Sequence, residues 1–176
     1  MLRAAGTQAS SLRDGDGDTI TGVDAAQTHH KVRLAGIDAP ERSQPCGQDA
    51  RLALHARVLH QEVSARCSKV DRYHREVCTL VRDGTDLNLA LLQAGLAWHY
   101  RAYAREQAPT DAQAYAEAEQ QARRAQRGLW AGPEPVPPWQ WRKDRAGAAH
   151  STSSALKSLT LVNVGPVTTR SPSASK

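Results

Sequence analysis

The sequence of 176 residues contains no phenylalanine and few aromatic residues of any kind, with four tryptophans and four tyrosines. A hydrophobic content of 40% is adequate for a core, which must then be built mainly from aliphatic side chains. No apolar run approaches the roughly 20 residues of a membrane-spanning helix, and the first residues lack the apolar stretch of a secretion signal. We therefore expect one domain of ordinary size plus tails, with no membrane partner.

Cysteine is also scarce. The three cysteines, Cys46, Cys67 and Cys78, are too few and too scattered for a zinc site. Cys67 and Cys78 lie symmetrically about the centre of a hairpin that we expect from residues 62–69 and 76–82. A cross-strand disulfide in an oxidising compartment and two free, buried thiols are both compatible with this placement.

The net charge of +5 is confined to the C-terminal segment. Residues 142–176 hold six basic residues and one acidic residue, which leaves 17 of the 23 basic and 17 of the 18 acidic residues for the first 141 positions. The basic balance therefore says little about the folded part of the chain. Any attraction of the domain for polyanions must come from a local arrangement of side chains.

What the sequence does contain is the short stretch VRLAGIDAPE at residues 32–41. Its first six residues suit a strand, which must end by Pro40 because proline donates no backbone hydrogen bond. Alternate residues of a strand share a face, so Arg33 stands on a side that would otherwise point inward, where it requires an anionic ligand or a carboxylate partner. Asp38 and Glu41 follow directly, so one guanidinium and two carboxylates are expected close together.

A second acidic stretch, DGDGDT, lies at residues 14–19. Taken alone, such a stretch is most often a solvated turn. An EF-hand is excluded, because Thr19 stands where the loop needs glycine and Ala25 stands where it needs a bidentate glutamate. Hard cations prefer oxygen-rich sites and phosphates prefer arginine, so Asp18 together with the stretch at 32–41 suggests metal-assisted chemistry on a phosphate.

The rest of the chain predicts short strands with three helices after the central stretch. Apolar spacing indicates a helix over residues 49–62, and Asp86 is a good N-cap for a second helix over residues 87–94. A third helix is expected to begin with Thr110 as its cap and to stop at Gly128. We therefore expect a mixed α+β domain built on a small barrel.

Four motifs occur in order along the chain: DGDTI at 16–20, VRLAGIDAPE at 32–41, DRYHR at 71–75 and LNLALLQAGLAWHY at 87–100. Together they resemble the thermonuclease family, typified by staphylococcal nuclease. The resemblance covers residues 13–130 and implies a five-stranded OB-type β-barrel with about three helices. Residues 131–145 form a Pro/Trp-rich extension similar to a segment that follows the nuclease domain in some bacterial members. Residues 146–176 have the composition of a disordered tail.

The resemblance also implies a set of site residues. Asp18 and Asp38 match the carboxylates that bind Ca²⁺, and Ala39 matches the residue whose backbone carbonyl joins them. Glu41 matches the general base that acts on the attacking water. Two arginines match those that hold the phosphate, and four further residues match nucleotide-contacting positions: Arg33 and Arg75 for the phosphate, and Arg72, Tyr73, Tyr100 and Tyr103 for the nucleotide.

The activity implied by the resemblance is that of a calcium-dependent endonuclease that cleaves DNA and RNA at the P–O5′ bond and leaves 3′-phosphate ends. Stacking on tyrosine rings tolerates any base, which favours single strands. A monomer is expected, and a secreted or periplasmic protein is expected from the resemblance. The alternatives are a non-catalytic OB-type nucleic-acid-binding module and an inactive truncated nuclease, since the N-terminal segment is poor in β-formers.

One departure from the family pattern concerns the third motif. Family members generally have glycine where this sequence has His74. A turn that requires a positive φ would then carry a side chain, although histidine tolerates that conformation better than most residues do. The placement of Arg75 depends on this turn.

Overall fold

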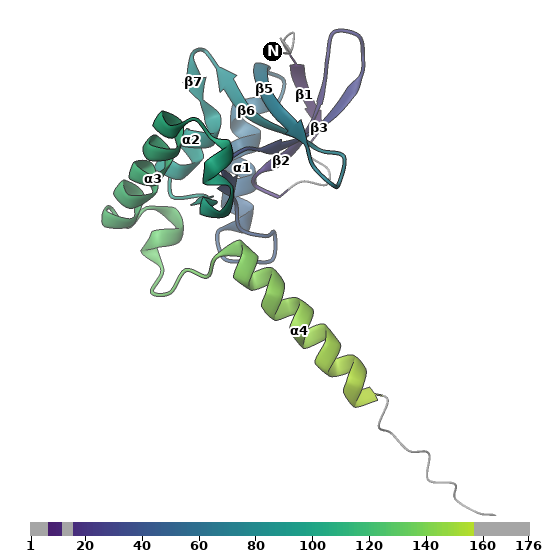
Figure 1. The fold of residues 1–176 in the computed structure, drawn as a ribbon, viewed down its shortest axis with the longest axis vertical. Coiled ribbons are helices and arrows are strands. Elements are labelled where there is room, and N and C mark those ends of the chain that lie inside the picture. The colour runs from purple at the N-terminus through teal and green to yellow at the C-terminus, as the bar shows by residue number, and fades with distance from the viewer. Residues whose placement is uncertain (1–6, 12–15, 157–176) are drawn as a thin grey trace, which may run out of the picture. The chain divides into compact units, whose positions relative to one another are not determined.

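The computed structural model describes residues 7–11 and 16–156 of the chain, and side chains from residue 16 to residue 147. The chain divides into two compact units, residues 1–142 and 143–176. The first unit contains the strands, the first three α-helices and the beginning of α4 (Figure 1). None of the helices in the described parts of the chain has both the length and the apolar character that crossing a membrane requires.

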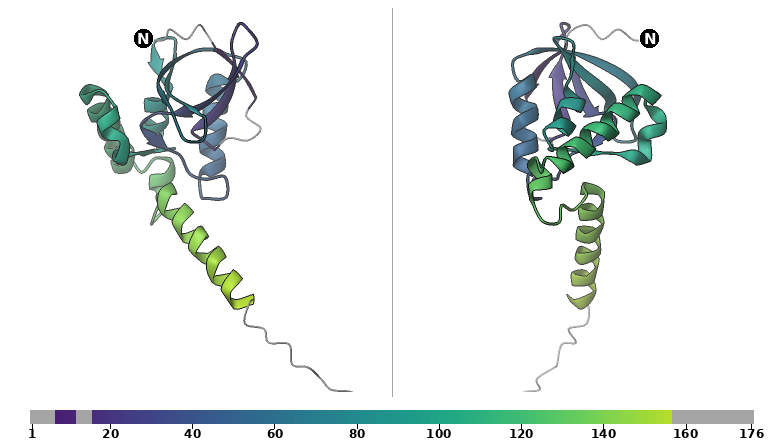
Figure 2. Two further views of the ribbon diagram at one scale, coloured as in Figure 1. Left: turned by 45° about the vertical axis from the view of Figure 1, so that its right-hand side comes forward. Right: turned by 90° about the vertical axis from the view of Figure 1, so that its left-hand side faces the viewer.

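Five strands form the barrel of the first unit, and the two strands at the ends of the strand order pair with each other. The order is β3-β2-β1-β5-β6, and β3 also pairs in parallel with β6. The left view of Figure 2 shows these strands curving around a common centre. The expected α+β fold with a five-stranded OB-type barrel is confirmed. The strands are β1 (Thr7–Ser11), β2 (Thr19–Val23), β3 (His29–Leu34), β5 (Glu62–Val70) and β6 (Glu76–Arg82).

Short strands extend this sheet and make a second one. β7 (Thr85–Asp86) pairs with the end of β6, at Val81 and Arg82, beyond the residues that pair with β3. β4 (Ile37–Asp38) and β8 (Trp98–His99) pair with each other as a separate two-stranded sheet, in which Asp38 lies opposite Trp98. The β4–β8 pairing therefore brings the second part of the central stretch against the aromatic segment that follows α2.

The first three helices begin and end for local reasons. α1 (Gly47–Val58) ends earlier than expected, because β5 starts only a few residues beyond it. α2 (Leu87–Gln93) begins as predicted, with the Asp86 carboxylate accepting a hydrogen bond of 3.0 Å from the backbone N–H of Leu89.

The predicted Thr110 cap is wrong. Ala108 is the N-cap of α3 (Pro109–Arg124), because Pro109 carries the helical φ at the first position and lacks the N–H that a cap would satisfy. α3 also ends at Arg124, before Gly128. Short 3₁₀ helices flank α3, η1 at Arg101–Glu106 and η2 at Gly128–Ala131.

The last described element lies in the C-terminal segment. α4 (Pro138–Leu156) begins within the Pro/Trp-rich extension and continues through residues 146–156, which the composition assigned to a disordered tail. Residues 157–176 of that tail lie outside the described residues.

The core of the barrel is aliphatic, as the absence of phenylalanine requires. α1 and α2 close it from outside, and α3 packs on α2 (Figure 2). A second, smaller cluster gathers tryptophan side chains around the end of α3. The largest buried side chains of the main core include Ile20, Leu34, Leu54, Leu80, Leu91 and Leu92, each at most 2% exposed.

Candidate active site

The central stretch is two strands rather than the single strand predicted over residues 32–37. β3 ends at Leu34, and Gly36, with φ +71°, makes the turn into β4. Val32 and Leu34 point into the core, so Arg33 points to the opposite side of β3. The expectation that Arg33 stands on the inward side of its strand is therefore wrong, because Val32 and Leu34 occupy that side and the turn at Gly36 separates Arg33 from β4.

A buried amide fixes the turn between β3 and β4. The Asn88 side chain on α2 donates hydrogen bonds to the carbonyls of Ala35 (3.0 Å) and Cys78 (3.1 Å), and it accepts one from the N–H of Leu80 (3.2 Å). Asn88 is completely buried, and these three bonds use most of its hydrogen-bonding capacity. Helix α2 and strand β6 thereby set the position from which β4 starts.

Asp18 and Asp38 are both buried, at 5% and 1% exposure. The Asp18 carboxylate accepts hydrogen bonds from the backbone N–H of Ala39 (2.8 Å) and from the hydroxyl of Thr19 (3.1 Å). The backbone carbonyl of Asp18 accepts a further bond from the N–H of Leu34 (2.8 Å). These contacts place the acidic stretch of residues 14–19 beside the end of β4, as the metal hypothesis requires.

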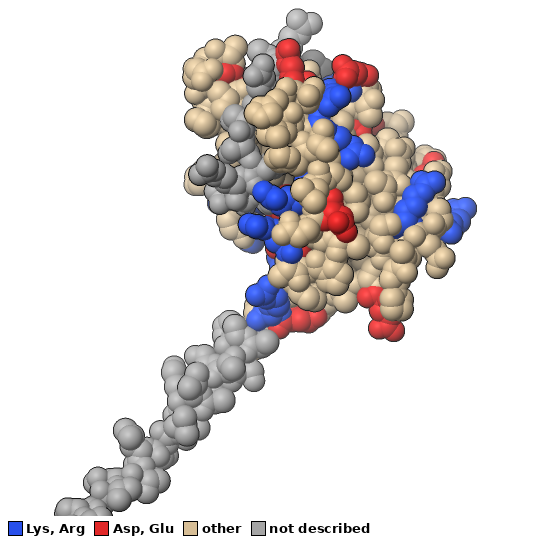
Figure 3. Space-filling model, turned by 180° about the vertical axis from the view of Figure 1, so that it is seen from behind, with Lys and Arg blue, Asp and Glu red and all other residues tan. Residues whose placement is uncertain are grey.

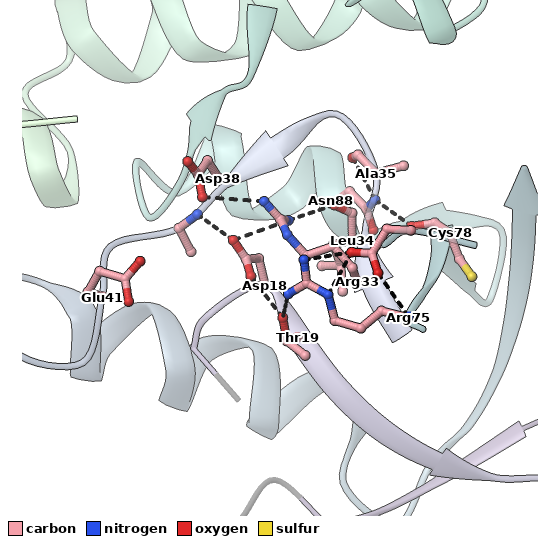
Figure 4. Close-up of polar contacts among 12 residues, drawn as sticks. Asp18, Thr19, Arg33, Leu34, Ala35, Asp38, Glu41, Arg75, Cys78 and Asn88 are labelled. Atoms are coloured by element: carbon pink, nitrogen blue, oxygen red, sulfur yellow. Dashed lines mark hydrogen bonds and ion pairs between the residues drawn. The ribbon is translucent and has the colours of Figure 1, made fainter. Parts of the chain in front are cut away.

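Arg33 lies between these two carboxylates. Its Nη1 atom is 3.1 Å from Asp18 Oδ2, and its Nη2 atom is 3.3 Å from Asp38 Oδ1. Nη1 also donates to the carbonyl of Leu34 (2.8 Å), and the side chain is only 13% exposed. Figure 4 shows the three side chains pointing toward one another, with Glu41 to one side of them.

Asp16 interacts with both Glu41 and Asp18, and so links Glu41 to the buried carboxylates. Burial, the charges of Glu41 and Asp18 and a hydrogen bond shared with Glu41 together raise the pKa of Asp16 to about 6. Burial likewise raises the pKa of Asp38 to about 6; a hydrogen bond from Arg142 opposes this rise, and the charge of Asp18 adds to it. Four carboxylates therefore crowd one region, which favours a cation there.

Arg142, at the beginning of α4, supplies such a positive charge. Its Nη2 atom is 2.7 Å from Asp38 Oδ2, and its Nη1 atom is 2.6 Å from Glu41 Oε1 and 3.3 Å from Asp38 Oδ1. Partial burial opposes its charged form, but the hydrogen bonds to the two carboxylates outweigh this and raise the pKa of Arg142. The sequence predicted no role for this residue.

Arg75 reaches the edge of the site. Its Nη1 atom lies 3.5 Å from the hydroxyl of Thr19, next to Asp18, while Nη2 pairs with Asp71 at 2.7 Å. His74 has φ 58°, the left-handed conformation expected from the family's glycine at this position. The turn is thus formed with histidine in place, and Asp71 also accepts a hydrogen bond from the N–H of Arg75 (2.9 Å).

The four predicted nucleotide-contacting residues fall into two groups. Tyr73 is 59% exposed, and the guanidinium of Arg72 lies 4.8 Å from its ring centroid. Tyr100 and Tyr103 pack against each other with centroids 4.9 Å apart. Burial raises the pKa of Tyr100, and the negative charge of Asp38 adds to this rise. The Tyr100–Tyr103 pair therefore borders the carboxylates.

The carboxylates match a hard cation by chemistry but are not gathered as ligands. Among the described side chains, the one group of three ligand atoms within 4.8 Å of one another is Cys67, Glu76 and Cys78. The sulfur atoms of that group form a disulfide and are not free to act as thiolate ligands. Guanidinium groups bridge Asp18 to Asp38 and Asp38 to Glu41. Carboxylate oxygens are suitable ligands for Ca²⁺. In this structure they are paired with the guanidinium groups of Arg33 and Arg142.

Comparison with known proteins identifies the family. A family model described as "Staphylococcal nuclease homologue" matches residues 31–132. The chain belongs to the staphylococcal nuclease family. It is 42% identical over 144 residues to a protein named micrococcal nuclease from Shigella flexneri, with 77% of this chain and 80% of that protein covered.

Two further relatives bear nuclease names. An "Uncharacterized endonuclease" from Haemophilus influenzae is 35% identical over 128 residues, which cover 73% of this chain and 68% of that protein. A "Probable staphylococcal-like nuclease CAN1" from Oryza sativa subsp. japonica is 37% identical over 124 residues, or 70% of this chain and 36% of the longer rice protein. Membership of the staphylococcal nuclease family supports a nuclease, hence a hydrolase, whose substrates are nucleic acids.

Three residues of this candidate site were not predicted from the sequence. Asn88 stands out as an amide inside an apolar helix, which signals a buried hydrogen-bond network. Asp16 belongs to the acidic stretch that pointed to Asp18. Arg142 lies within the Pro/Trp-rich extension of residues 131–145, to which the sequence assigned no chemical role. Basic and acidic side chains are interspersed on the face shown in Figure 3, in line with the balanced charge of the first 141 residues.

Proposed function

We propose that this staphylococcal nuclease-like chain is a calcium-dependent endonuclease acting on DNA and RNA, with single strands favoured. The observation that carries the proposal is the Arg33 guanidinium, which contacts two buried carboxylates while Glu41 lies beside them. Such an arrangement suits a phosphodiester, because arginine matches the geometry of phosphate oxygens and the carboxylates match a hard cation.

The proposed cation site uses Asp18, Asp38 and the backbone carbonyl of Ala39. When bound, Ca²⁺ supplies positive charge beside the phosphate and polarises it. Both carboxylates are held in advance, Asp18 by the N–H of Ala39 and Asp38 by its place opposite Trp98 in the β4–β8 pair. Little backbone rearrangement is then needed to bring the two carboxylates to a cation.

The proposed mechanism assigns the reacting groups to three residues. Glu41 accepts a proton from the attacking water, whose oxygen forms a bond to phosphorus while the P–O5′ bond breaks. The 5′-hydroxyl leaves with a proton from solvent, and the phosphate stays on the 3′ end. Arg33 and Arg75 hold the equatorial oxygens, where negative charge grows in the transition state. Removing one such group commonly costs on the order of 10²–10³ in rate.

The proposed nucleotide contacts include two exposed tyrosine rings. Tyr73, with Arg72 against its ring, is exposed, and Tyr103 is 45% exposed. Exposed rings can stack on bases of any identity, which supports cleavage without strong sequence preference. Unstacked bases are most accessible in single strands, which is the basis for the proposed preference.

The test is an assay of the purified chain on single-stranded DNA, duplex DNA and RNA, with Ca²⁺ or with chelator. We expect cleavage only with Ca²⁺, fastest on single strands, and 3′ ends that a polymerase extends only after phosphatase treatment. Glu41→Gln should reduce turnover by about 10²–10³, whereas the matched control Glu134→Gln, at an exposed loop residue, should not. Equal cleavage with chelator, or none by a folded sample, would remove the proposal in favour of a binding module.

A further inference from the structure

Arg142 holds two proposed functional groups at once. All three hydrogen bonds described for its guanidinium end on Asp38 or Glu41, at 2.6 to 3.3 Å. One of these carboxylates is the proposed metal ligand and the other is the proposed general base. Both Asp38 oxygens and one Glu41 oxygen are therefore occupied by a side chain that the proposed reaction does not use.

The sequence after η2 places Arg142 there. Pro138 starts α4, and Trp139 in its first turn stacks on Tyr100 with centroids 5.4 Å apart and ring planes 13° from parallel. Arg142 follows Trp139 by three residues, so the two side chains share one face of the helix. The buried Gln44 fixes the preceding segment, since its amide donates to the carbonyl of Val136.

Gln44 also connects this segment to the general base. Its Oε1 atom accepts a hydrogen bond of 3.2 Å from the backbone N–H of Glu41. The Gln44 side chain thus joins the loop that carries Glu41 to the segment that precedes α4. The contact between Arg142 and the site is therefore built into the first unit of the chain, which ends at this residue.

The Arg142 side chain can leave the carboxylates more easily than the Arg33 side chain can. Arg33 is 13% exposed and also donates to the carbonyl of Leu34. Arg142 is 45% exposed and contacts the acidic group from its solvent side. Because the Arg142 side chain is about half exposed, it can leave without unpacking the core, and a cation that binds buried Asp38 replaces the positive partner which that carboxylate loses.

We infer that Arg142 is an autoinhibitory residue, which closes the site by pairing with Asp38 and Glu41 and is displaced when a divalent cation binds. This inference rests on the proposed cation site at Asp18 and Asp38. A guanidinium and a divalent ion compete for the same Asp38 oxygens, and each weakens the binding of the other. The apparent affinity for the cation is then reduced by the fraction of molecules in which Arg142 is bound.

The test measures Ca²⁺ binding by isothermal titration calorimetry on the whole chain, without substrate. Arg142→Gln should bind Ca²⁺ at least about fivefold more tightly than wild type, because the competitor is gone. Lys143→Gln removes the same charge one residue further along and should stay within about twofold of wild type. Asp38→Asn should abolish binding, and thermal melting shows whether each variant is folded.

A second measurement follows Arg142 itself. Ca²⁺ should increase the rate at which phenylglyoxal modifies Arg142 in the wild-type protein, as read by peptide mapping, and should leave the exposed Arg105 unchanged. Equal Ca²⁺ affinity in Arg142→Gln and Lys143→Gln, or no change in labelling, would overturn the inference and leave the proposed function standing. Absence of Ca²⁺ binding in every protein would overturn the calcium dependence and this inference together.

Discussion

The Nη1 atom of Arg33 lies 3.1 Å from the Oδ2 atom of Asp18, and both side chains are largely buried. Replacing Arg33 by alanine would leave Asp18 and Asp38 as neighbouring buried charges with one partner fewer. We expect turnover to fall by about 10²–10³, and we expect stability measured by urea unfolding without metal to fall as well, by a few kcal/mol.

Arg33→Lys is the matched variant for this first prediction. It keeps the charge but loses the two-pronged contact, so it should recover most of the stability and little of the turnover. Full turnover in either variant would mean that Arg33 is only a structural partner of Asp18 and Asp38.

The turn at His74 offers a test of backbone strain. A non-glycine residue with φ 58° is strained, whereas glycine adopts this conformation readily but loses more chain entropy on folding. His74→Gly should therefore raise the free energy of unfolding by up to about 1 kcal/mol. Gly84 has φ +75° with open space around it, so Gly84→Ala should lower stability by about as much. Destabilisation by His74→Gly would show that the imidazole makes a compensating contact.

His30 should make stability depend on pH. Its two ring nitrogens lie 2.9 Å from Glu76 Oε1 and 3.1 Å from Asp24 Oδ2. Hydrogen bonds to Glu76 and then to Asp24 raise the pKa of His30 above 6.5 in the folded protein. The stabilisation is therefore fully present below pH 6.5, as long as the carboxylates are ionised, and is lost as the pH rises through the folded-state pKa.

The comparison for this third prediction is between His30→Gln and His29→Gln, measured by chemical unfolding at pH 5.5 and pH 8.5. His30→Gln should lower the free energy of unfolding by about 1 kcal/mol or less at pH 5.5 and hardly change it at pH 8.5. The exposed neighbour His29 should show no such difference. An equal cost at both values would indicate that packing, not charge, makes the contribution.

A disulfide joins the two hairpin strands. Cys67 and Cys78 lie opposite each other in the β5–β6 register and are bonded, while Cys46 is free. Cross-links of this sequence separation, 11 residues, typically stabilise by about 2–3 kcal/mol by restricting the unfolded chain. Reduction should lower the urea midpoint of the wild-type protein and leave that of the double variant Cys67→Ser/Cys78→Ser unchanged. Three reactive thiols in the native, unreduced protein would contradict the pairing.

The pattern of short strands predicted a small barrel, and the position of Arg33 on its strand predicted a carboxylate partner or an anionic ligand, which agrees with the contacts of Arg33 with Asp18 and Asp38. The alternation around Val32 and Leu34 marked a strand, and Asp86 marked the start of α2 from side-chain chemistry alone. The Cys67–Cys78 pairing remained open at that level, because two facing cysteines in a hairpin need not be oxidised.

The site features that could not be predicted depend mostly on contacts between residues far apart in the sequence. Arg142 pairs with Asp38 from 104 residues away, and no spacing rule links the two. The turn at Gly36 was hidden because the apolar residues on either side of it read as one strand. Asn88 likewise acts on Ala35, 53 residues earlier, through a bond that only the folded chain reveals.

The parallel pairing of β3 with β6 has a consequence for folding. It sets Arg33 directly beside Val77, two residues after Arg75, so both proposed phosphate-binding side chains reach one place only after residues far apart in the chain have met. Contacts of long sequence separation form slowly, because the connecting chain must lose entropy first. During refolding from denaturant, cleavage activity should therefore return no earlier than the joining of these two strands, which makes enzyme turnover a kinetic reporter of barrel assembly.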